Sequence, residues 1–421
     1  MSTIADQTPE EAAPAPKITV ADRSLWPLLS RLHFYAAVLV APFLVIAALT
    51  GLAYAFTPQL DRLIYADEMR VERVAGPLRP LSEQVRAARV THPEGAVATV
   101  IPPTSEVQTT RVVLDVPDLE PKQRTVYVDP YTNRVAGALT TDFGSTPVTT
   151  WLSELHRCLH LGKVGALYSE MAASWLWVIA AAGLLMWLGR RHYRGSTRLH
   201  RIFWPDRSSR GLRRTRGRHA VLGIWLAVGL LLLSATGLTW TDHAGANFDK
   251  LQARFDSTAP KLNTAASGAH AGHQAGGAAS QFDPAVHIDH ALATARSAGL
   301  SGPLEITPPE KQGSSWQVAQ ADNTWPVRQD AVAIDPTGHR VTDRVDWAEH
   351  PTMAKLSTLG IQLHMGRLFG VPNQVGMAAL ALGLLTILFL GYRMWWQRRP
   401  TRTGHRRPMG RPPARGALRQ V

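Results

Sequence analysis

The sequence lacks several features that are typical of common enzyme classes. Its 421 residues include one cysteine, Cys158, which excludes an internal disulfide and every metal or cofactor motif built on paired cysteines. No glycine-rich GxGxxG or P-loop pattern occurs in a context that would bind a nucleotide. Charged residues are absent from four long apolar runs, at residues 35–56, 171–188, 220–240 and 368–392.

These uncharged runs predict four transmembrane helices. A helix rises about 1.5 Å per residue, so roughly 20 residues cross a hydrocarbon core about 30 Å thick. The alternative, a core helix buried in a soluble enzyme, seldom extends this far without a charged residue. We therefore predict an integral membrane protein in contact with the lipid bilayer. Its first run is interpreted as an uncleaved anchor, because that run is too long for the apolar region of a signal peptide.

The net charge of +13 is concentrated in two segments beside the predicted spans. Residues 190–218 contain eleven arginines and one acidic residue, Asp206, and residues 393–421 contain nine arginines and no acidic residue. Arginine is enriched on the cytoplasmic side of membrane proteins and is attracted to anionic lipid, so this charge requires no nucleic acid partner. The prediction is a plasma (inner) membrane protein with both termini cytoplasmic and with residues 57–170 and 241–367 external.

Three kinds of short sequence motif recur in the same order and predict an internal two-fold repeat. His33 and His219 each precede a Thr-Gly pair by 17 residues, at a constant offset of 186. Residues 159–163 resemble 363–367, and residues 128–135 resemble 334–341. Each copy contains a span, an external domain and a second span. Because two spans return the chain to the same side, the copies are parallel and related by a pseudo-twofold axis along the membrane normal.

The predicted fold class is a membrane α-helical bundle of four transmembrane helices with two small external α+β domains. In the first domain we expect a helix at 81–90 and strands at 109–116 and 123–128, and in the second a helix at 285–298 and strands at 315–320 and 331–334. The expected segments are a cytoplasmic N-terminal segment (1–30), the first span (31–56), the first external domain (57–150), the second span with a preceding amphipathic turn (151–189), a basic cytoplasmic loop (190–218), the third span (219–240), a flexible linker and second external domain (241–350), the fourth span with a preceding helix (351–396) and a basic cytoplasmic tail (397–421).

Five histidines near the ends of the predicted spans are candidate cofactor ligands. The pseudo-twofold axis would bring His33 opposite His219 near the cytoplasmic face, and His160 opposite His364 near the external face. His156 lies one helical turn before His160, so either of the two is a candidate partner of His364. Imidazole is a standard axial ligand of haem iron, and the core of a helical bundle holds cofactors between facing helices. The pattern predicts two haems, one in each leaflet, and therefore an electron path across the bilayer.

Other interpretations of the histidines stay open. A histidine at a helix end often lies at the polar interface, and Thr-Gly pairs also serve helix packing. Zinc fits less well, because no cysteine or carboxylate accompanies these histidines to complete a tetrahedral set. His270 and His273 lie in the linker at 259–280 and are candidates for a weak metal site, with His287 and His290 nearby. Spaced histidines in such linkers are usually only solvated.

The sequence resembles the PepSY-associated transmembrane proteins, a family that includes iron-regulated and iron-uptake membrane proteins. The likeness covers nearly the whole chain, and its main phrases are Arg31-Leu-His33 with Thr50-Gly51, Glu154-Leu-His156-Arg157, Ala172-Ala-Ser-Trp175-Leu-Trp177, the Asp-Pro turns at 129–130 and 335–336, and residues 354–370. Members include inner-membrane ferric-siderophore reductases with two b-type haems, so the resemblance implies both the cofactors and a reductase activity. In the family the Leu-His-Arg histidine is the usual one, which favours His156, whereas the repeat favours His160.

The predicted function is transmembrane electron transfer, from a cytoplasmic or quinol donor through two b-type haems to an external acceptor. A ferric chelate or siderophore is the expected acceptor, because reduction to Fe(II) weakens binding by hard oxygen ligands. The cytoplasmic segments are too short for a nucleotide-binding domain, so the donor is a separate molecule. The rival hypothesis is a non-enzymatic membrane module whose PepSY units bind peptide or restrain a secreted peptidase. The sequence identifies no catalytic residue.

Overall fold

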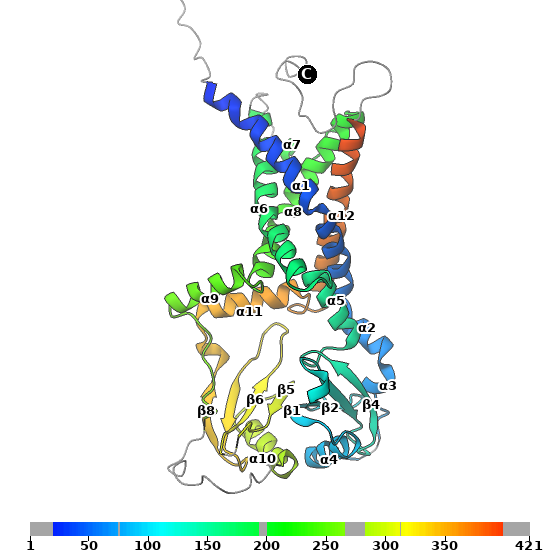
Figure 1. The fold of residues 1–421 in the computed structure, drawn as a ribbon, viewed down its shortest axis with the longest axis vertical. Helices are drawn as coiled ribbons and strands as arrows, with labels where there is room; N and C mark the ends of the chain where they lie inside the picture. Colours follow the sequence, from blue (N-terminus) through cyan, green and yellow to red (C-terminus); the bar gives the residue numbers. More distant parts are fainter. Residues whose placement is uncertain (1–19, 75, 193–199, 266–282, 312, 399–421) are drawn as a thin grey trace, which may run out of the picture. The chain divides into compact units, whose positions relative to one another are not determined.

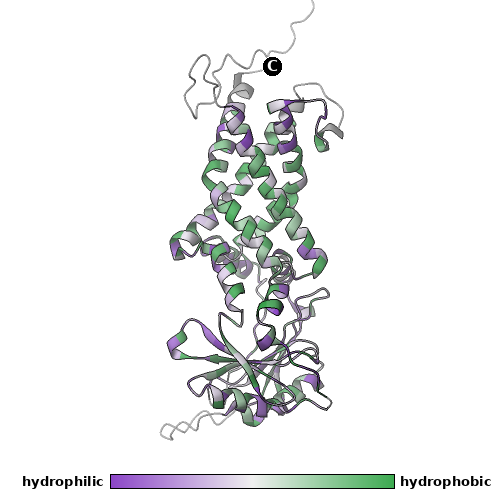
Figure 2. Ribbon diagram, turned by 90° about the vertical axis from the view of Figure 1, so that its right-hand side faces the viewer, coloured by the Kyte–Doolittle hydropathy of each residue, from purple (hydrophilic) through white to green (hydrophobic). Residues whose placement is uncertain are grey.

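Four long helices account for the apolar runs of the sequence. The computed structural model describes residues 20–74, 76–192, 200–265, 283–311 and 313–398. Within these residues four helices are long and apolar enough to cross a membrane, and they are α1 (Val20–Ala55), α6 (Gly162–His192), α8 (Gly211–Leu238) and α12 (Val371–Gln397). Figure 2 shows them as mostly hydrophobic along their length. Large apolar side chains on them are exposed, including Val228 (78%) and Phe389 (63%), as expected for surfaces that face lipid.

The chain divides into two compact units, and each long helix contributes to both. We call residues 1–39, 175–225 and 390–421 the basic unit, and residues 40–174 and 226–389 the sheet unit. In the sheet unit, α8 and α12 approach closely through two glycines. A Cβ added at Gly229 would lie 2.5 Å from Leu380, and one added at Gly383 would lie 2.6 Å from Leu226. Small residues of this kind are typical of packed membrane helices.

Shorter helices flank the long ones. They are α2 (Thr57–Ile64), α3 (Ala66–Met69), α5 (Pro147–Cys158), α7 (His200–Phe203), α9 (Ala244–Arg254) and α11 (Thr352–His364). We predicted only an amphipathic turn before the second span, but α5 is a helix of three turns. Its start is well specified, because the Thr146 side chain accepts a hydrogen bond from the backbone N–H of Thr149 (3.2 Å) and Pro147 follows at the first helical position. The helix predicted before the fourth span corresponds to α11.

The strands form one antiparallel sheet of eight. They are β1 (Ala96–Ile101), β2 (Thr110–Asp115), β3 (Gln123–Val128), β4 (Val135–Thr141), β5 (Leu304–Thr307), β6 (Trp316–Gln320), β7 (Ala331–Ile334) and β8 (Val341–Val345), in the order β4-β3-β2-β1-β5-β6-β7-β8. The strands predicted from the sequence correspond to β2, β3, β6 and β7. Each half of the sheet is a four-stranded meander, and β1 pairs with β5 where the halves meet.

We expected two small domains, but the two halves share one sheet and one hydrophobic core. Helices α4 (Leu81–Thr91) and α10 (Pro284–Ser297) pack against each other and against the sheet, side by side in Figure 1. Fully buried Val85, Ile288 and Trp316 belong to the same core. At the junction, the one registered pair between β1 and β5 is Val100 with Ile306, and both side chains are completely buried. An exposed edge strand pairs readily with another edge strand. Pairing of β1 with β5 therefore removes one exposed edge from each meander.

Polar contacts between the halves reinforce this core. The carboxylate of Asp289 on α10 accepts hydrogen bonds from the backbone N–H groups of Leu81 (2.7 Å) and Ser82 (3.3 Å) at the start of α4. Arg89 of α4 forms an ion pair with Asp283, the N-cap residue of α10 (2.6 Å). Each helix is therefore held at its first turn or beside it by the other half of the sheet domain, where the helix dipole favours negative charge.

The two predicted Asp-Pro turns have the expected form. The Asp129 N–H donates to the Arg134 carbonyl (2.8 Å) and the Asp335 N–H to the Arg340 carbonyl (2.9 Å). Asn133 takes the left-handed conformation (φ 60°), which asparagine tolerates better than most residues. Burial alone would raise the pKa of Asp335, but hydrogen bonds from the backbone of Arg340 and His339 and from a threonine hydroxyl lower it overall.

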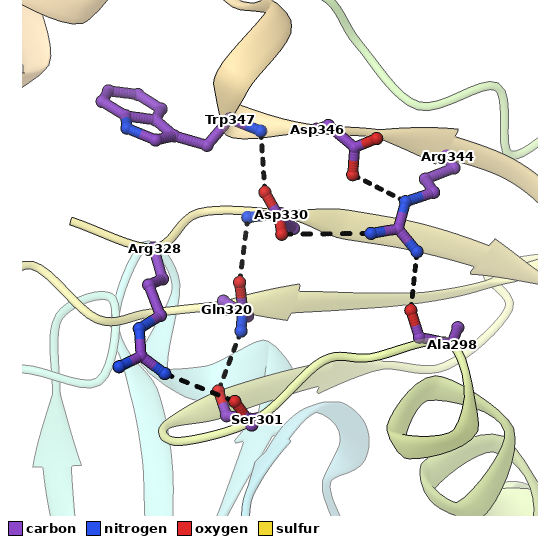
Figure 3. Close-up of polar contacts among 8 residues, drawn as sticks. All are labelled: Ala298, Ser301, Gln320, Arg328, Asp330, Arg344, Asp346 and Trp347. Carbon is purple, nitrogen blue, oxygen red and sulfur yellow. Dashed lines mark hydrogen bonds and ion pairs between the residues drawn. The ribbon is translucent and has the colours of Figure 1, made fainter. Parts of the chain in front are cut away.

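A second polar network joins the strands of the C-terminal half (Figure 3). Asp330 accepts a hydrogen bond from the Trp347 N–H (2.8 Å), and its own N–H donates to the Gln320 side chain (3.3 Å). The Arg344 guanidinium donates to Asp346 (2.6 Å) and to the Ala298 carbonyl (2.6 Å). These contacts link β6, β8 and the end of α10, and they lead directly into the turn that precedes α11.

Replacing Asp289 with alanine tests whether the two halves are one folding unit. Asp289→Ala is expected to destabilise the full-length protein by about 1–2 kcal/mol, as for the loss of a helix cap. Thermal unfolding in detergent should follow one transition that moves to lower temperature. Asp118→Ala, which removes an exposed carboxylate on the 3-10 turn Pro117–Leu119, is the control and should leave the transition in place. A variant in which only the N-terminal half unfolds early would contradict the shared core.

Candidate functional site

Histidines from four helices form two facing pairs. His33 of α1 and His219 of α8 lie in the basic unit, with ring centres 6.2 Å apart and ring planes at 86°. His156 of α5 and His364 of α11 lie in the sheet unit, with ring centres 6.3 Å apart and ring planes at 84°. The two pairs have nearly the same geometry, although different helices build them.

The spacing of both pairs suits one metal ion bound between two imidazoles. A histidine nitrogen lies about 2 Å from a metal that it ligates. It also lies about 1.1 Å from the centre of its own ring, because bonds in the ring are near 1.33 Å. Two such ligands on opposite sides of a metal therefore place their ring centres about 6 Å apart. In haem the macrocycle fills the other positions, so two axial histidines are a complete protein contribution.

A carbonyl group fixes the tautomer of the first histidine. Nδ1 of His33 lies 2.8 Å from the carbonyl oxygen of Ile179 on α6. A carbonyl oxygen only accepts hydrogen bonds, so Nδ1 of His33 carries the proton and donates it. The lone pair of the neutral ring is then on Nε2.

Threonine hydroxyls fix the tautomers of the histidines in the sheet unit. Nδ1 of His156 lies 3.0 Å from the Thr50 hydroxyl, and Nδ1 of His364 lies 2.9 Å from the Thr236 hydroxyl. Each threonine donates its single hydroxyl proton to a carbonyl one turn earlier in its own helix, at 2.7 and 2.8 Å. Each hydroxyl therefore accepts from the imidazole, so that Nδ1 is again the protonated nitrogen.

The other ring nitrogen is left for a ligand in these three residues. In the described part of the chain, Nε2 of His33, His156 and His364 makes no hydrogen bond. A histidine that binds a metal usually donates its remaining N–H to an oxygen, which orients the ring and fixes the ligating nitrogen. The hydrogen bonds at Nδ1 supply this arrangement, so Nε2 is the nitrogen with which each ring would hold iron.

Each of the four histidines lies against a glycine of a neighbouring helix. The facing glycines are Gly183 for His33, Gly391 for His219, Gly51 for His156 and Gly237 for His364. A Cβ added at Gly183 would lie 3.1 Å from Cε1 of His33, which is tighter than almost all real contacts. The corresponding distance at Gly391 is 3.7 Å, an ordinary van der Waals contact. Gly183 is therefore needed for the observed position of His33, whereas Gly391 leaves room for a methyl group.

His160 lies apart from both pairs. Helix α5 ends with two residues in the left-handed conformation, Leu159 and His160 (both φ 54°), and this turn brings His160 to the surface. Its Nδ1 is 3.1 Å from the carboxylate of Glu154, and its ring centre is 5.3 Å from that of Trp151. Of the two alternatives left open by the sequence, the structure therefore places His156 opposite His364.

Among the described residues, the other histidines do not form a pair that faces across two helices. His270 and His273 lie outside the described residues. On α10, the ring centres of His287 and His290 are 6.4 Å apart, and His290 stacks on His339 at 4.3 Å. Nowhere in the described segments do three or more His, Cys, Asp or Glu side chains gather as a metal-binding group. The weak metal site of the linker remains a prediction.

The roles of two threonines and the position of Gly391 against a histidine were not predicted from the sequence. Thr50 and Thr236 stood out only as recurring Thr-Gly pairs, although their hydroxyls contact the histidines of other helices. For the glycines, the sequence did contain an indication, namely the number of residues between them. Gly183 and Gly391 are 208 residues apart, and so are His156 and His364. In the repeated motif that contains His160, this histidine and His364 are 204 residues apart, which does not match the spacing of 208.

Among the comparisons with known proteins, one family model matches most of the chain. The model of the family described as the PepSY-associated TM region matches residues 30–398. This range includes most of α1, all of α6, α8 and α12, the sheet and all four paired histidines. No curated protein matches the chain.

The two glycines facing the first pair provide a matched test of its geometry. Gly183→Ala is expected to displace the His33 ring and to reduce binding of the haem predicted there, because its Cβ would lie only 3.1 Å from Cε1. Gly391→Ala, at 3.7 Å from His219, should retain that haem. The measurement is haem per protein chain in purified material. Equal haem content in the two variants would show that the close approach of Gly183 to His33 does not control binding.

Proposed function

The chain belongs to the PepSY-associated transmembrane family, and from its two histidine pairs we propose that it is a di-haem protein that carries electrons through the membrane to a ferric chelate. The observation that carries this proposal is the near-identical geometry of the pairs, at 6.2 and 6.3 Å between ring centres. A histidine at a polar interface needs neither a facing histidine nor a fixed tautomer. Both features are expected of axial ligands.

The residues of the chain have separate tasks in this proposal. His33 and His219 hold one b-type haem, and His156 and His364 hold the other. The hydrogen bonds from Nδ1 of His33, His156 and His364 hold the proton on Nδ1, so that Nε2 would be the nitrogen that binds iron. When bound, haem supplies reversible one-electron transfer between its ferric and ferrous states.

The substrate in this proposal is a ferric ion held by a chelator. One electron converts Fe(III) to Fe(II), a softer and less highly charged ion that hard oxygen ligands hold more weakly. The electron comes from a reduced donor such as a quinol. One quinol supplies two electrons, reduces two ferric ions and releases two protons on its own side. The donor and the chelator are separate molecules, because the described residues contain no nucleotide-binding motif.

The direction of transfer follows from the distribution of charge. Residues 190–218 and 393–421 carry twenty arginines between them, and we propose that this side is cytoplasmic and that the membrane is the plasma membrane. The donor then acts at the His33–His219 pair and the ferric chelate is reduced on the side of the sheet. The internal repeat belongs to the same proposal, since His33 and Thr50 on α1 correspond to His219 and Thr236 on α8.

Alanine variants of the histidines test the proposal directly. The purified wild-type protein is expected to be red and to contain two haems per chain. His33→Ala or His219→Ala should remove one haem, and His156→Ala or His364→Ala should remove the other, because one axial ligand is lost in each case. His160→Ala is the matched control and should retain both haems. Absorption spectra and haem content per chain are the measurements.

Electron transfer across the membrane of a vesicle completes the test of function. Wild-type protein in a sealed vesicle should reduce a ferric chelate on one side with a quinol supplied from the other, and either class of ligand variant should stop this reaction. A colourless wild-type protein would favour the rival hypothesis of a non-enzymatic PepSY module. Full haem content in all four variants would refute the assignment of the ligands.

The orientation has its own prediction. A reporter inserted near Ser208 is expected to be cytoplasmic and one inserted near Thr104 in the sheet domain external, because arginine-rich loops resist translocation. A reporter fused after Val421 should agree with Ser208. Accessibility of single cysteines at these positions, in a variant without Cys158, is an independent measurement. If the reporter near Ser208 were found on the external side, the proposed direction of electron transfer would be reversed.

A further inference from the structure

Four arginines surround a cavity in the basic unit. Arg210, Arg214 and Arg218 come from the start of α8 and the residue before it, and Arg393 comes from α12. Together with Thr215 and Leu390 they line a hollow of about 170 Å³. In the described part of the chain no carboxylate pairs with any of these four guanidinium groups. No acidic residue occurs in the first turn of α8, where the backbone itself presents partial positive charge.

This concentration of positive charge favours the binding of an anion. Guanidinium groups around one cavity repel each other, and a helix N-terminus adds to the positive potential. A carboxylate or phosphate relieves this repulsion and accepts paired hydrogen bonds from the planar guanidinium forks. The cavity is therefore chemically suited to a ligand with more than one anionic oxygen.

The cavity lies beside the His33–His219 pair. Thr215, which lines it, is four residues before His219 and therefore on the same face of α8, about 6 Å along the axis. On the other helix, Leu390 lines the cavity and the next residue is Gly391, whose added Cβ would lie 3.7 Å from Cε1 of His219. The cavity is thus one helical turn from the proposed axial ligand.

We infer that the four arginines bind the two propionate carboxylates of the haem held by His33 and His219. This inference rests on the proposed function. A b-type haem is anchored by no covalent bond, and its two carboxylates are costly to place in hydrocarbon unless cations pair with them. The four arginines would hold the carboxylate edge of the macrocycle. Their positive charge also stabilises the reduced haem, which has one electron more than the oxidised form, and so raises the reduction potential of that haem.

The test compares two double variants that remove the same charge. Arg214→Gln with Arg218→Gln removes two guanidinium groups that line the cavity. Arg207→Gln with Arg213→Gln removes two exposed arginines of the same segment that do not line it. Both are made in the full chain. The measurements are redox titration of each haem by absorption and the rate at which haem passes to an excess of a haem-binding acceptor protein.

The cavity variant is expected to lower the reduction potential of one haem and to release that haem faster, by on the order of tenfold or more for lost charge-assisted hydrogen bonds. The control variant should behave like wild type. The effect should persist when His156→Ala has removed the other haem, and this places it at the His33–His219 pair.

Other outcomes overturn the inference in distinguishable ways. Unchanged potentials and release rates in a fully loaded cavity variant would show that the arginines do not hold the propionates. Loss of co-purified anionic phospholipid from that variant, measured as phosphorus per chain, would assign the cavity to a lipid head group instead. A wild-type protein without haem would refute the proposed function itself, and the inference with it.

Discussion

An imidazole placed among membrane helices has two ring nitrogens, and neither can depend on bulk water for a partner. Polar groups in such surroundings are satisfied internally or at a considerable free-energy cost. In His33, His156 and His364 one nitrogen is satisfied by an oxygen of a neighbouring helix, at 2.8 to 3.0 Å. The second nitrogen of each has no hydrogen bond in the described residues. Because His156 and His364 both carry the proton on Nδ1, neither ring can donate to Nε2 of the other, and the iron of the proposed haem would satisfy both.

This constraint assigns a double role to two of the long helices. Helix α1 carries His33 for one pair and Thr50, the acceptor that orients His156, for the other. Helix α8 likewise carries His219 and Thr236, the acceptor for His364. The 17-residue spacing that marked the sequence is therefore the distance along one helix between a proposed ligand and the support of another. In the proposed function, each of these two helices therefore contributes one residue to each haem site.

The sequence was sufficient for the features that depend on local composition. Uncharged runs predicted the four long helices, alternation predicted strands such as β2 and β3, and Asp129 and Asp335 predicted their turns. Features that depend on long-range packing were not predictable. The pairing of Val100 with Ile306 that merges the two halves joins two strands, β1 and β5, that were not predicted from the sequence. The choice between His156 and His160 depended on the left-handed turn at Leu159 and His160, which neither residue type predicts.

The shared sheet also accounts for the position of the second histidine pair. Helix α5, which carries His156, follows β4 through the cap at Thr146, and α11, which carries His364, follows β8 through a 3-10 turn (Figure 1). These two strands are the outer edges of one continuous sheet, so the β1–β5 join determines how far apart the two helices begin. In the proposed function this pair would ligate haem, and such ligation tolerates errors of only about 0.5 Å. Two independently mobile domains would not hold His156 and His364 to that tolerance, whereas one sheet with a common core does.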